Sequence, residues 1–521
     1  MGEERIHFDT DPSRYRHWRL AVDGPVATLT MTVDPAGGLR GDYELKLNSY
    51  DLAVDIELHD ALQRLRFEHP GVKAVVITGG LDKVFCAGAN IQMLATSSHA
   101  HKVGFCKFTN ETRNGIEEMS KNGGQVVLAA VNGTAAGGGY ELALSCDEIL
   151  LVDDRTSAVS LPEVPLLAVL PGTGGLTRLV DKRHVRRDLA DVFVTKAEGA
   201  KGRQALEWGL VDAIAPPSTF DELVRMRALD RAAASDRPDD ADGVVLGPLE
   251  RRHVVVDVDR GRGVATIVVR AFSSLLESLE ACRELDGTIL DLRFNEPDIG
   301  TWVLHTEGDP DQIAQADAEI SGEGWLPREV RLFWGRTLKR LDQSSRTLIA
   351  LVTPESCFTG TLAELALAAD RTLLLDDGET SLLFTGVNDG SYLMANGLSR
   401  LETRFWGRDD ELATARSLFG KALTADDALA AGLVTAAPDD LDWDDEVRLL
   451  LEERASFSPD ALTGMEANLR YPGPETMETK IFARLTAWQN WIFQRPNAVG
   501  PEGALQRYGT GARPTFDRRR V

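Results

Sequence analysis

Cysteine is scarce in this sequence, with only five residues among 521. Cys86, Cys106, Cys146, Cys282 and Cys357 are widely spaced and form no Cys-x-x-Cys pair. This excludes a small disulfide-stapled scaffold and a zinc ribbon. An odd number of isolated thiols is typical of a reducing compartment, and we expect free cysteines.

Basic residues are also under-represented. Lysine and arginine total 57 against 81 aspartates and glutamates, which gives a formal net charge of −24. Proteins that follow phosphate backbones or anionic lipid surfaces are usually basic. The charge balance therefore disfavours a nucleic-acid partner and a membrane partner for the chain as a whole.

Long apolar runs are absent, and no stretch approaches the 18 uninterrupted apolar residues of a membrane span. The segment Met1–Asp9 has no apolar signal core, so we expect a cytoplasmic protein. The only close histidine pair, His99 and His101, has no third ligand nearby in the sequence, and no metal site is predicted.

What the sequence does contain is alternation of strand and helix patterns. The spacing of Leu58, Leu62 and Leu65 predicts an amphipathic helix over Leu52–His69. Short β-branched or aliphatic runs predict strands at Val26–Met31, Lys73–Thr78, Val126–Val131 and Glu148–Val152. Alternation of this kind predicts a layered α/β fold.

The chain also repeats itself. The Glu141-Leu-Ala-Leu-x-x-Asp147 motif recurs 223 residues later as Glu364-Leu-Ala-Leu-x-x-Asp370, and three further matches follow in the same order. We therefore predict two copies of one α/β domain, at residues 1–235 and 251–450. Residues 236–250 are the predicted linker, and residues 451–521 a helical tail whose aromatic stripe (Trp488, Trp491, Ile492, Phe493) is expected to serve packing.

The most informative segment is residues 131–147, where a strand runs through three glycines into a helix pattern. The first N–H groups of a helix have no internal partner, and they favour developing negative charge. Gly138 could thus supply one donor of an oxyanion hole. The same glycines would equally suit a tight strand-to-helix connection, but they fit neither a dinucleotide fingerprint nor a phosphate loop.

A second glycine loop, Lys83–Ile91, follows the predicted strand Lys73–Thr78. The Ala89 N–H could approach the same point as the Gly138 N–H. Two peptide N–H groups on one carbonyl oxygen would stabilise an enolate or a tetrahedral anion, by about 3–4 kcal/mol per donor in studied enzymes.

Two carboxylates are expected near this point. Glu141 lies in the first turn of the predicted helix, and Glu163 follows Pro162. A glutamate pair in a partly dry cleft can move protons when its two pKa values differ. Glu141 could instead complement the helix dipole, and Glu163 could be a solvated loop residue. Cys86 lies in the first glycine loop, where a buried inert thiol is the simpler interpretation.

These segments resemble the crotonase (enoyl-CoA hydratase/isomerase) superfamily. Residues 83–93, 130–147 and 160–179 match in order and separation. The resemblance implies a ββα spiral that binds an acyl-CoA and polarises its thioester carbonyl. By resemblance, Ala89 and Gly138 form the oxyanion hole, and Glu141 and Glu163 are the acid–base pair.

Features along nearly the whole chain, including residues 47–51, 105–113 and 488–497, resemble more narrowly a family of carbon–carbon lyases of aerobic benzoate breakdown. That resemblance implies hydrolytic ring opening of 2,3-epoxybenzoyl-CoA with two waters, giving 3,4-dehydroadipyl-CoA semialdehyde and formate. It implies a homodimer, no cofactor beyond the CoA thioester substrate, and a contribution from Cys86. An enoyl-CoA hydratase or isomerase and a non-catalytic acyl-CoA-binding protein are the alternatives.

The second copy departs from this pattern, since it lacks the glycine triplet and has no carboxylate where Glu163 would recur. We therefore expect it to be degenerate, without catalysis. The CoA phosphates require some cations despite the overall acidity, and Lys83 and Lys46 are candidates, with Gly137 lining the same site.

Overall fold

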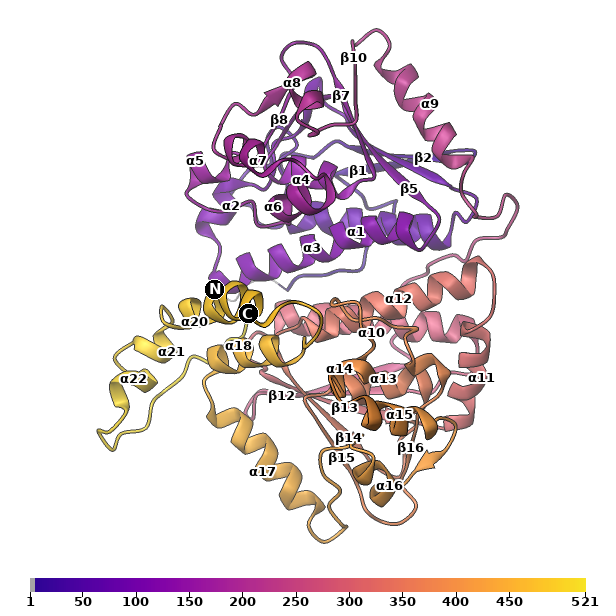
Figure 1. Ribbon diagram of the computed structural model, residues 1–521, viewed down its shortest axis with the longest axis vertical. Coiled ribbons are helices and arrows are strands. Elements are labelled where there is room, and N and C mark those ends of the chain that lie inside the picture. Colours follow the sequence, from indigo (N-terminus) through magenta and orange to yellow (C-terminus); the bar gives the residue numbers. More distant parts are fainter. Residues whose placement is uncertain (1–4) are drawn as a thin grey trace. The chain divides into compact units, whose positions relative to one another are not determined.

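The computed structural model describes residues 5–521 and divides the chain into two units (Figure 1). The N-terminal unit is His7–Pro248, and the C-terminal unit is Leu249–Val521 together with Arg5 and Ile6. The chain passes between the units at the end of the predicted linker. No helix within residues 5–521 has the length and apolarity needed to cross a bilayer.

The N-terminal unit is built on a six-stranded sheet in the order β1-β2-β3-β5-β7-β10. Only the β1–β2 pair is antiparallel. The strands are β1 (Trp18–Asp23), β2 (Val26–Met31), β3 (Ala74–Gly79), β5 (Val126–Val131), β7 (Glu148–Val152) and β10 (Ala213–Ala215). Four of these are the strands that the sequence predicts, with β3 displaced by one residue.

A smaller sheet of four strands, in the order β4-β6-β8-β9, carries the two glycine loops. Its strands are β4 (Lys83–Cys86), β6 (Gly133–Ala136), β8 (Ala158–Ser160) and β9 (Ala200–Lys201). Since β4, β6 and β8 run parallel, the chain leaves all three at the same edge of the sheet. This edge gathers segments that are more than 70 residues apart in sequence.

The helices of this unit surround the two sheets. They are α1 (Leu52–Phe67), α2 (Ile91–Thr96), α3 (His99–Lys121), α4 (Gly138–Ser145), α5 (Glu163–Leu167), α6 (Gly175–Thr177), a π-helical turn η1 (Arg178–Lys182), α7 (Arg187–Val194), α8 (Gly202–Glu207) and α9 (Phe220–Ala232). Asp51 caps α1 by accepting from the Ala53 and Val54 N–H groups, which explains why the predicted helix starts at Leu52.

The core of the unit lies between the large sheet and its covering helices. Leu128 and Leu150 of the sheet pack with Phe220 and Ala228 of α9, and all four are buried. The alternating in-and-out pattern of β2, with every second residue buried, matches a strand that has one face on the core.

The segment predicted as a linker has no helix or strand between α9 and Val254, yet it is anchored to the N-terminal unit. The buried guanidinium of Arg237 donates to the carbonyl oxygens of Arg66, Pro70 and Gly123. The Leu246 N–H donates to Glu68. Up to Pro248 this segment is therefore part of the first unit.

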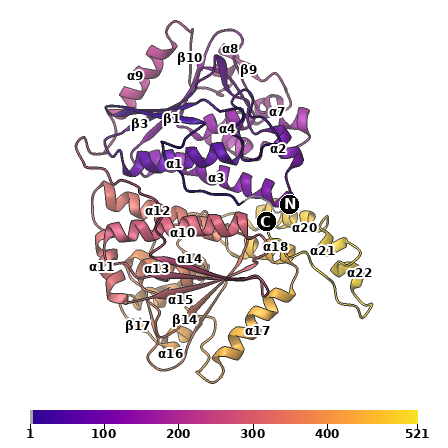
Figure 2. The same ribbon diagram turned by 180° about the vertical axis from the view of Figure 1, so that it is seen from behind.

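The C-terminal unit has a five-stranded sheet in the order β11-β12-β13-β14-β15 (Figure 2). Its first pair is antiparallel and the others are parallel, as in the N-terminal sheet. The strands are β11 (Val254–Asp259), β12 (Val264–Arg270), β13 (Thr301–Glu307), β14 (Thr347–Val352) and β15 (Arg371–Leu374), with a two-stranded ribbon of β16 (Leu382–Leu383) and β17 (Ala422–Leu423).

Helices follow the strands of this unit and then form the tail. They are α10 (Leu275–Asn295), α11 (Pro310–Ile320), α12 (Trp325–Asp342), α13 (Gly360–Ala368), the 3-10 turn η2 (Gly386–Asn388), α14 (Arg400–Arg404), α15 (Asp409–Ser417), α16 (Ala425–Ala430), α17 (Trp443–Ser456), α18 (Pro459–Leu469), α19 (Met477–Thr479), the π-helical η3 (Lys480–Leu485), α20 (Thr486–Ile492), α21 (Pro496–Val499) and α22 (Ala504–Arg507).

The predicted tail helix is present as the continuous run α19–η3–α20, but its aromatic stripe is incompletely covered. Trp488 and Trp491 are half-buried with ring centroids 5.5 Å apart, and an added Cβ at Gly464 of α18 would meet Ile492 and Trp488. Phe493 is 53% exposed. Packing against α18 therefore accounts for only part of the stripe.

Candidate active site

The two glycine loops converge where β4 and β6 end. Cys86 pairs with Ala135 across these strands, so the loops that follow leave the sheet together. A Cβ added to Gly88 would lie 2.9 Å from the Gly138 nitrogen. Only a residue without a side chain permits this approach, which brings the loop around Gly88 and Ala89 close to the start of α4.

Both amides are directed away from the chain's own acceptors. Tyr50 accepts from Asn90 and donates to Gly88, and in this parallel pairing the Ala89 N–H between them points to the opposite side. Gly138 is the first residue of α4, where an N–H has no intrahelical partner. Within residues 5–521, neither N–H donates a hydrogen bond.

Glu141 lies in the first turn of α4 and is 3% exposed. Its Oε1 accepts from the N–H groups of Thr173 at 3.0 Å and Gly175 at 2.8 Å, and its Oε2 accepts from the Thr173 hydroxyl. Burial raises the pKa of Glu141, while these donors and the charge of Arg113 oppose the shift. The result is a carboxyl group held in one orientation by neutral donors.

Glu163 is the first residue of α5 and lies beside Gly137. The Gly137 N–H donates to the Ser160 carbonyl oxygen at 2.9 Å, which ties the two segments together. Gly137 has φ of +54°, and a Cβ there would lie 2.6 Å from Glu163 Oε1. Gly137 therefore leaves room for the Glu163 carboxyl, and its predicted contact with substrate stays a prediction.

The environment of Glu163 differs from that of Glu141. Glu163 is 9% exposed, and its buried Oε2 has no hydrogen-bond partner in the described part of the chain. Burial, followed by the charge of Glu141, raises the pKa of Glu163 to about 7. One carboxyl is thus fixed and the other is free to exchange a proton near neutral pH.

Arg113, whose charge acts on Glu141, and Tyr50, beside Gly138, are two further residues near the start of α4 to which the sequence assigned no role. The buried Arg113 guanidinium carbon is 5.6 Å from the centre of the Tyr50 ring, and one of its nitrogens is 3.6 Å from Asp55. The Tyr50 hydroxyl would lie 2.1 Å from a Cβ on Gly138. Both residues lie in segments on which the family resemblance rests, residues 47–51 and 105–113. The sequence therefore marked these segments as informative, but it did not indicate what either residue does.

Cys86 does not have the surroundings of a reactive thiol. It is fully buried, its Sγ donates to the Asn48 carbonyl oxygen, and it accepts from the Gly88 N–H. Burial raises its pKa to about 12, so the thiol is protonated at neutral pH. The geometry supports a structural role. Burial, followed by the charge of Glu141, raises the pKa of a different thiol, the half-buried Cys106 of α3, to about 11.

The predicted CoA-binding lysines lie at the surface. Lys46 forms an exposed ion pair with Glu44 at 2.9 Å, and the Lys83 side chain at the start of β4 is exposed. No group of three or more histidine, cysteine or acidic side chains within residues 5–521 is arranged to hold a metal ion.

The comparisons with known proteins concern the fold and the family of the chain. Residues 44–236 match the family model for enoyl-CoA hydratase/isomerase. This match confirms a crotonase-like α/β fold for the N-terminal unit, where both glutamates and both amides lie. Residues 44–236 cover no part of the C-terminal unit.

Two relatives and one solved structure illustrate the extent of the similarity. The chain is 53% identical over 545 aligned positions to benzoyl-CoA-dihydrodiol lyase of Aromatoleum evansii, covering 99% of this chain and 98% of that protein. It is 33% identical to the fatty acid oxidation complex subunit alpha of Shewanella loihica, over 42% of this chain and 28% of that protein. An enoyl-CoA hydratase structure from Bacillus anthracis is 27% identical, covers 42% of this chain and 77% of its own, and has a TM-score of 0.36.

Identity above one half, sustained along almost the entire length of both proteins, joins this chain to a family of lyases. On that similarity and on the domain match, the chain belongs to the benzoyl-CoA-dihydrodiol lyase family of the crotonase superfamily.

Proposed function

We propose that this chain opens the ring of 2,3-epoxybenzoyl-CoA hydrolytically, consuming two waters and releasing 3,4-dehydroadipyl-CoA semialdehyde and formate. The benzoyl-CoA-dihydrodiol lyase relative, similar along its whole length, supports a benzoyl-CoA-derived substrate and a carbon–carbon cleavage. The proposal places the reaction in aerobic benzoate breakdown through CoA thioesters.

The single observation that carries the proposal is the division of the glutamate pair into a fixed and a free carboxyl. Glu163, with an unpartnered oxygen and a pKa of about 7, takes a proton from an attacking water and later returns it. Glu141, held by Thr173 and Gly175, accepts a hydrogen bond from the second water and orients it.

The amides of Ala89 and Gly138 hold the thioester oxygen. When the ring carbon–carbon bond breaks, the electron pair moves onto the thioester as an enolate, and the two N–H groups stabilise its oxygen. Their unused donors and the start of α4 favour negative charge at that point. Lys83 and Lys46 are proposed contacts for the CoA phosphates because both side chains reach the surface.

We also propose that the C-terminal unit is a degenerate second copy of the crotonase-like domain. Its sheet has the same sequence of antiparallel and parallel pairings, and Glu364 occupies in α13 the position of Glu141 in α4. It lacks the four-stranded companion sheet, however, and has only the ribbon β16–β17.

The proposed partner is a second copy of the chain. The tail presents large apolar side chains to solvent, among them Leu469 at 70%, Met477 at 78% and Phe482 at 68% exposure. Large exposed apolar side chains are typical of surfaces that a partner covers. A homodimer formed through the tail would cover it, and sedimentation of the purified chain measures whether it forms.

An enoyl-CoA hydratase activity is the second candidate, supported by the family match over residues 44–236. Offering 2,3-epoxybenzoyl-CoA and crotonyl-CoA in turn separates the two. Formate from the first substrate, lost in Glu141→Gln and in Glu163→Gln, supports ring opening. A 3-hydroxyacyl-CoA from the second substrate without formate supports the hydratase. If neither product forms, a non-catalytic acyl-CoA-binding protein is the remaining candidate.

A further inference from the structure

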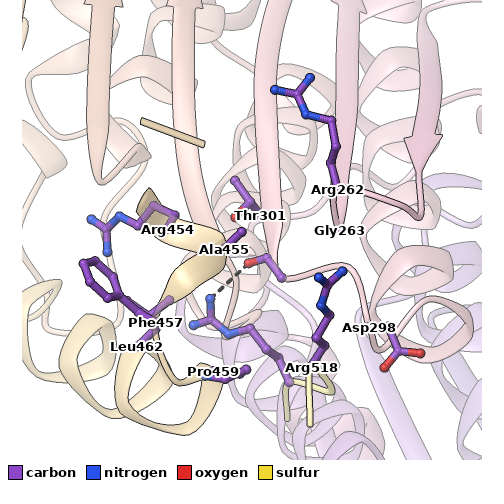
Figure 3. Close-up of a pocket in the computed structure, with 12 residues that line it drawn as sticks. Arg262, Gly263, Asp298, Thr301, Arg454, Ala455, Phe457, Pro459, Leu462 and Arg518 are labelled. Atoms are coloured by element: carbon purple, nitrogen blue, oxygen red, sulfur yellow. Dashed lines mark hydrogen bonds between the residues drawn. The ribbon is translucent and has the colours of Figure 1, made fainter. Parts of the chain in front are cut away.

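The sequence has a large acidic excess, yet one pocket of the C-terminal unit is lined by arginines. Arg262 comes from the β11–β12 turn, Arg454 from α17, and Arg518 and Arg520 from the terminal segment (Figure 3). Asp298 is the one acidic side chain in the lining. Three arginines thus lie in excess of acid around one space of about 390 Å³, its mouth included.

Two of these guanidinium groups have no carboxylate partner within residues 5–521. Arg518 is exposed and donates only to the Gly261 carbonyl oxygen at 3.1 Å. Arg262 is exposed on the turn and forms no ion pair. Most other exposed arginines of this unit, such as Arg448 with Asp445, are paired with acids of their own.

A third guanidinium is buried and only partly satisfied. Arg454 is 7% exposed, its nearest carboxylate oxygen, on Glu466, is 3.9 Å away, and its buried Nε has no hydrogen-bond partner among the described residues. A buried N–H of a charged group without an acceptor destabilises the folded chain. Arg454 therefore brings an incompletely satisfied positive group to the wall of the pocket.

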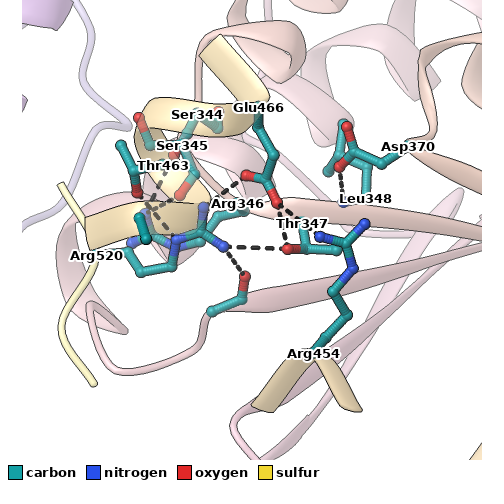
Figure 4. A network of polar contacts seen from close by, with 12 residues as sticks. Ser344, Ser345, Arg346, Thr347, Leu348, Asp370, Arg454, Thr463, Glu466 and Arg520 are labelled. Atoms are coloured by element: carbon teal, nitrogen blue, oxygen red, sulfur yellow. Dashed lines mark hydrogen bonds and ion pairs between the residues drawn. The ribbon is translucent and has the colours of Figure 1, made fainter. Parts of the chain in front are cut away.

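The shortage of acid continues behind the pocket wall (Figure 4). Glu466 is shared by Arg520 at 2.5 Å and Arg454 at 3.9 Å, while Arg470, 3.8 Å from Glu466, is paired with Asp370 at 2.6 Å. Arg346 is 1% exposed, donates only to the carbonyl oxygens of Ser344 and Ser345, and has two nitrogens without a partner in the described chain. Positive charge concentrated in a poorly solvated place attracts an anion.

The chemistry of the lining indicates which anion. Guanidinium groups bind phosphate through paired N–H donors, and Thr301 with the glycine backbone at Gly263 and Gly300 adds smaller polar surface. Phe457, Pro459 and Leu462 supply an apolar side beside Arg454. A phosphate group attached to a flat or apolar moiety would contact the arginines through the phosphate and the apolar side through that moiety.

We propose that this arginine pocket of the C-terminal unit is a binding site for a phosphate group, either free phosphate or the phosphorylated nucleotide end of a CoA compound. The pocket belongs to the unit that lacks the glutamate pair, so the proposal is independent of the ring-opening reaction. It gives the terminal Arg518–Arg520 motif two roles, with Arg520 buried as an anchor and Arg518 presented to the ligand.

The test titrates the full chain with inorganic phosphate and with adenosine 3′,5′-bisphosphate at constant ionic strength, by calorimetry and by thermal shift. The variant Arg262→Gln/Arg518→Gln removes two exposed, unpaired guanidinium groups without touching the buried network. Arg448→Gln is the matched control, because it removes an exposed arginine of α17 that does not line the pocket.

We expect saturable binding and a raised melting temperature for the wild type and for Arg448→Gln. Affinity should fall at least tenfold in the double variant, since each lost charged hydrogen bond is worth about 1.5–3 kcal/mol. Tighter binding of the bisphosphate than of phosphate identifies the nucleotide end of CoA, and equal binding identifies free phosphate. No saturable binding of either probe, or equal affinity in the double variant, overturns the proposal.

Discussion

Glu141 in α4 and Glu364 in α13 occupy matching positions of two helices, but their carboxyl groups have different partners. A glycine of positive φ precedes α4, and another is the first residue of α13. Glu141 accepts from neutral donors of one loop. Glu364 accepts from Asn388 at 2.8 Å and from Arg400 at 3.0 Å, and Arg400 is itself paired with Asp342 at 2.6 Å.

The amides at the start of the two helices differ in the same way. The Gly138 N–H has no acceptor within residues 5–521, whereas the N–H of Thr361, its counterpart 223 residues later, donates to Asp317 at 3.0 Å. A carboxylate from α11 thus accepts the hydrogen bond of this N–H. The Gly138 N–H of the N-terminal site is available to a ligand, whereas the corresponding N–H of the C-terminal unit is already hydrogen-bonded to Asp317.

The sharpest test of this difference exchanges each glutamate for glutamine. Glu141→Gln and Glu163→Gln should each lower kcat about 10²–10⁴-fold, because the first loses the carboxylate that orients the second water and the second loses the group that exchanges the proton. Glu364→Gln should leave kcat close to the wild-type value. The measurement is formate release at saturating 2,3-epoxybenzoyl-CoA, with circular dichroism to verify folding.

A folded Glu364→Gln variant without turnover would contradict the proposal that the second unit is a structural copy. Full activity in Glu163→Gln would contradict the role given to the free carboxyl. Since the variants differ from wild type by one atom each, the comparison isolates proton transfer from packing.

The next test uses the two glycines. A Cβ at Gly137 would meet Glu163 Oε1 at 2.6 Å, and a Cβ at Gly360, where φ is +45°, would meet Asp317. Alanine at either position should cost about 1–3 kcal/mol of stability from backbone strain. Only Gly137→Ala should also lower kcat, about 10²-fold, because it displaces a reacting carboxyl.

Unfolding in urea and steady-state kinetics of both variants check this expectation. Equal loss of kcat in Gly360→Ala would show that the C-terminal unit supports the chemistry. Unchanged kcat in Gly137→Ala would show that the position of Glu163 is not set by this glycine.

Much of the N-terminal site was predictable because its signals are local. The glycine triplet, the loop carrying Ala89 and the two glutamates each stand in a short motif, and the strands predicted around them lie where the pattern indicates. The partners of Glu141 were not predictable from the residues alone, since Thr173 and Gly175 lie more than 30 positions away in a loop. The pairing of Glu364 with Arg400 likewise depends on a contact 36 residues apart.

Cys86 shows why proximity in sequence misleads. It lies three residues before Ala89, but it is the last residue of β4, and a Cβ on Gly139 would meet its Cβ at 2.7 Å. The strand therefore directs this side chain under α4, where its Sγ is occupied by the Gly88 N–H and the Asn48 carbonyl oxygen. Its predicted contribution to catalysis has no support in this geometry.

The pH dependence of stability sharpens the comparison further. Folding raises the pKa of Glu163 from 4.5 to about 7, so between these values the folded chain holds a proton that the unfolded chain releases. The contribution of protonated Glu163 to the stability of the folded chain is complete below pH 4.5 and is lost as the pH rises through 7. At pH 8 the buried charge costs about 2 kcal/mol, allowing for partial exposure.

Glu163→Gln should therefore be more stable than wild type at pH 8 by about 2 kcal/mol, and this gain should vanish at pH 4. Glu364→Gln should instead be less stable at pH 8, since it leaves the buried Arg400 with Asp342 as its only acid. Chemical denaturation at both pH values measures these differences. A Glu163→Gln variant that is less stable than wild type at pH 8 would contradict the assigned pKa.

The smallest expected effect concerns two buried tyrosines, Tyr50 beside Gly138 of α4 and Tyr392 beside Thr361 of α13. The Tyr392 hydroxyl is 2.8 Å from the Thr361 hydroxyl, which in turn donates to Asp317. The Tyr50 hydroxyl has no partner in the described part of the chain. Tyr392→Phe should cost about 1 kcal/mol of unfolding free energy, and Tyr50→Phe should change it by less than about 0.5 kcal/mol or stabilise the chain. Urea denaturation of the two variants measures these losses. Equal losses would mean that the Tyr50 hydroxyl is hydrogen-bonded within the chain, as the Tyr392 hydroxyl is. The N-terminal site would then no longer differ from the C-terminal unit in having polar groups available to a ligand.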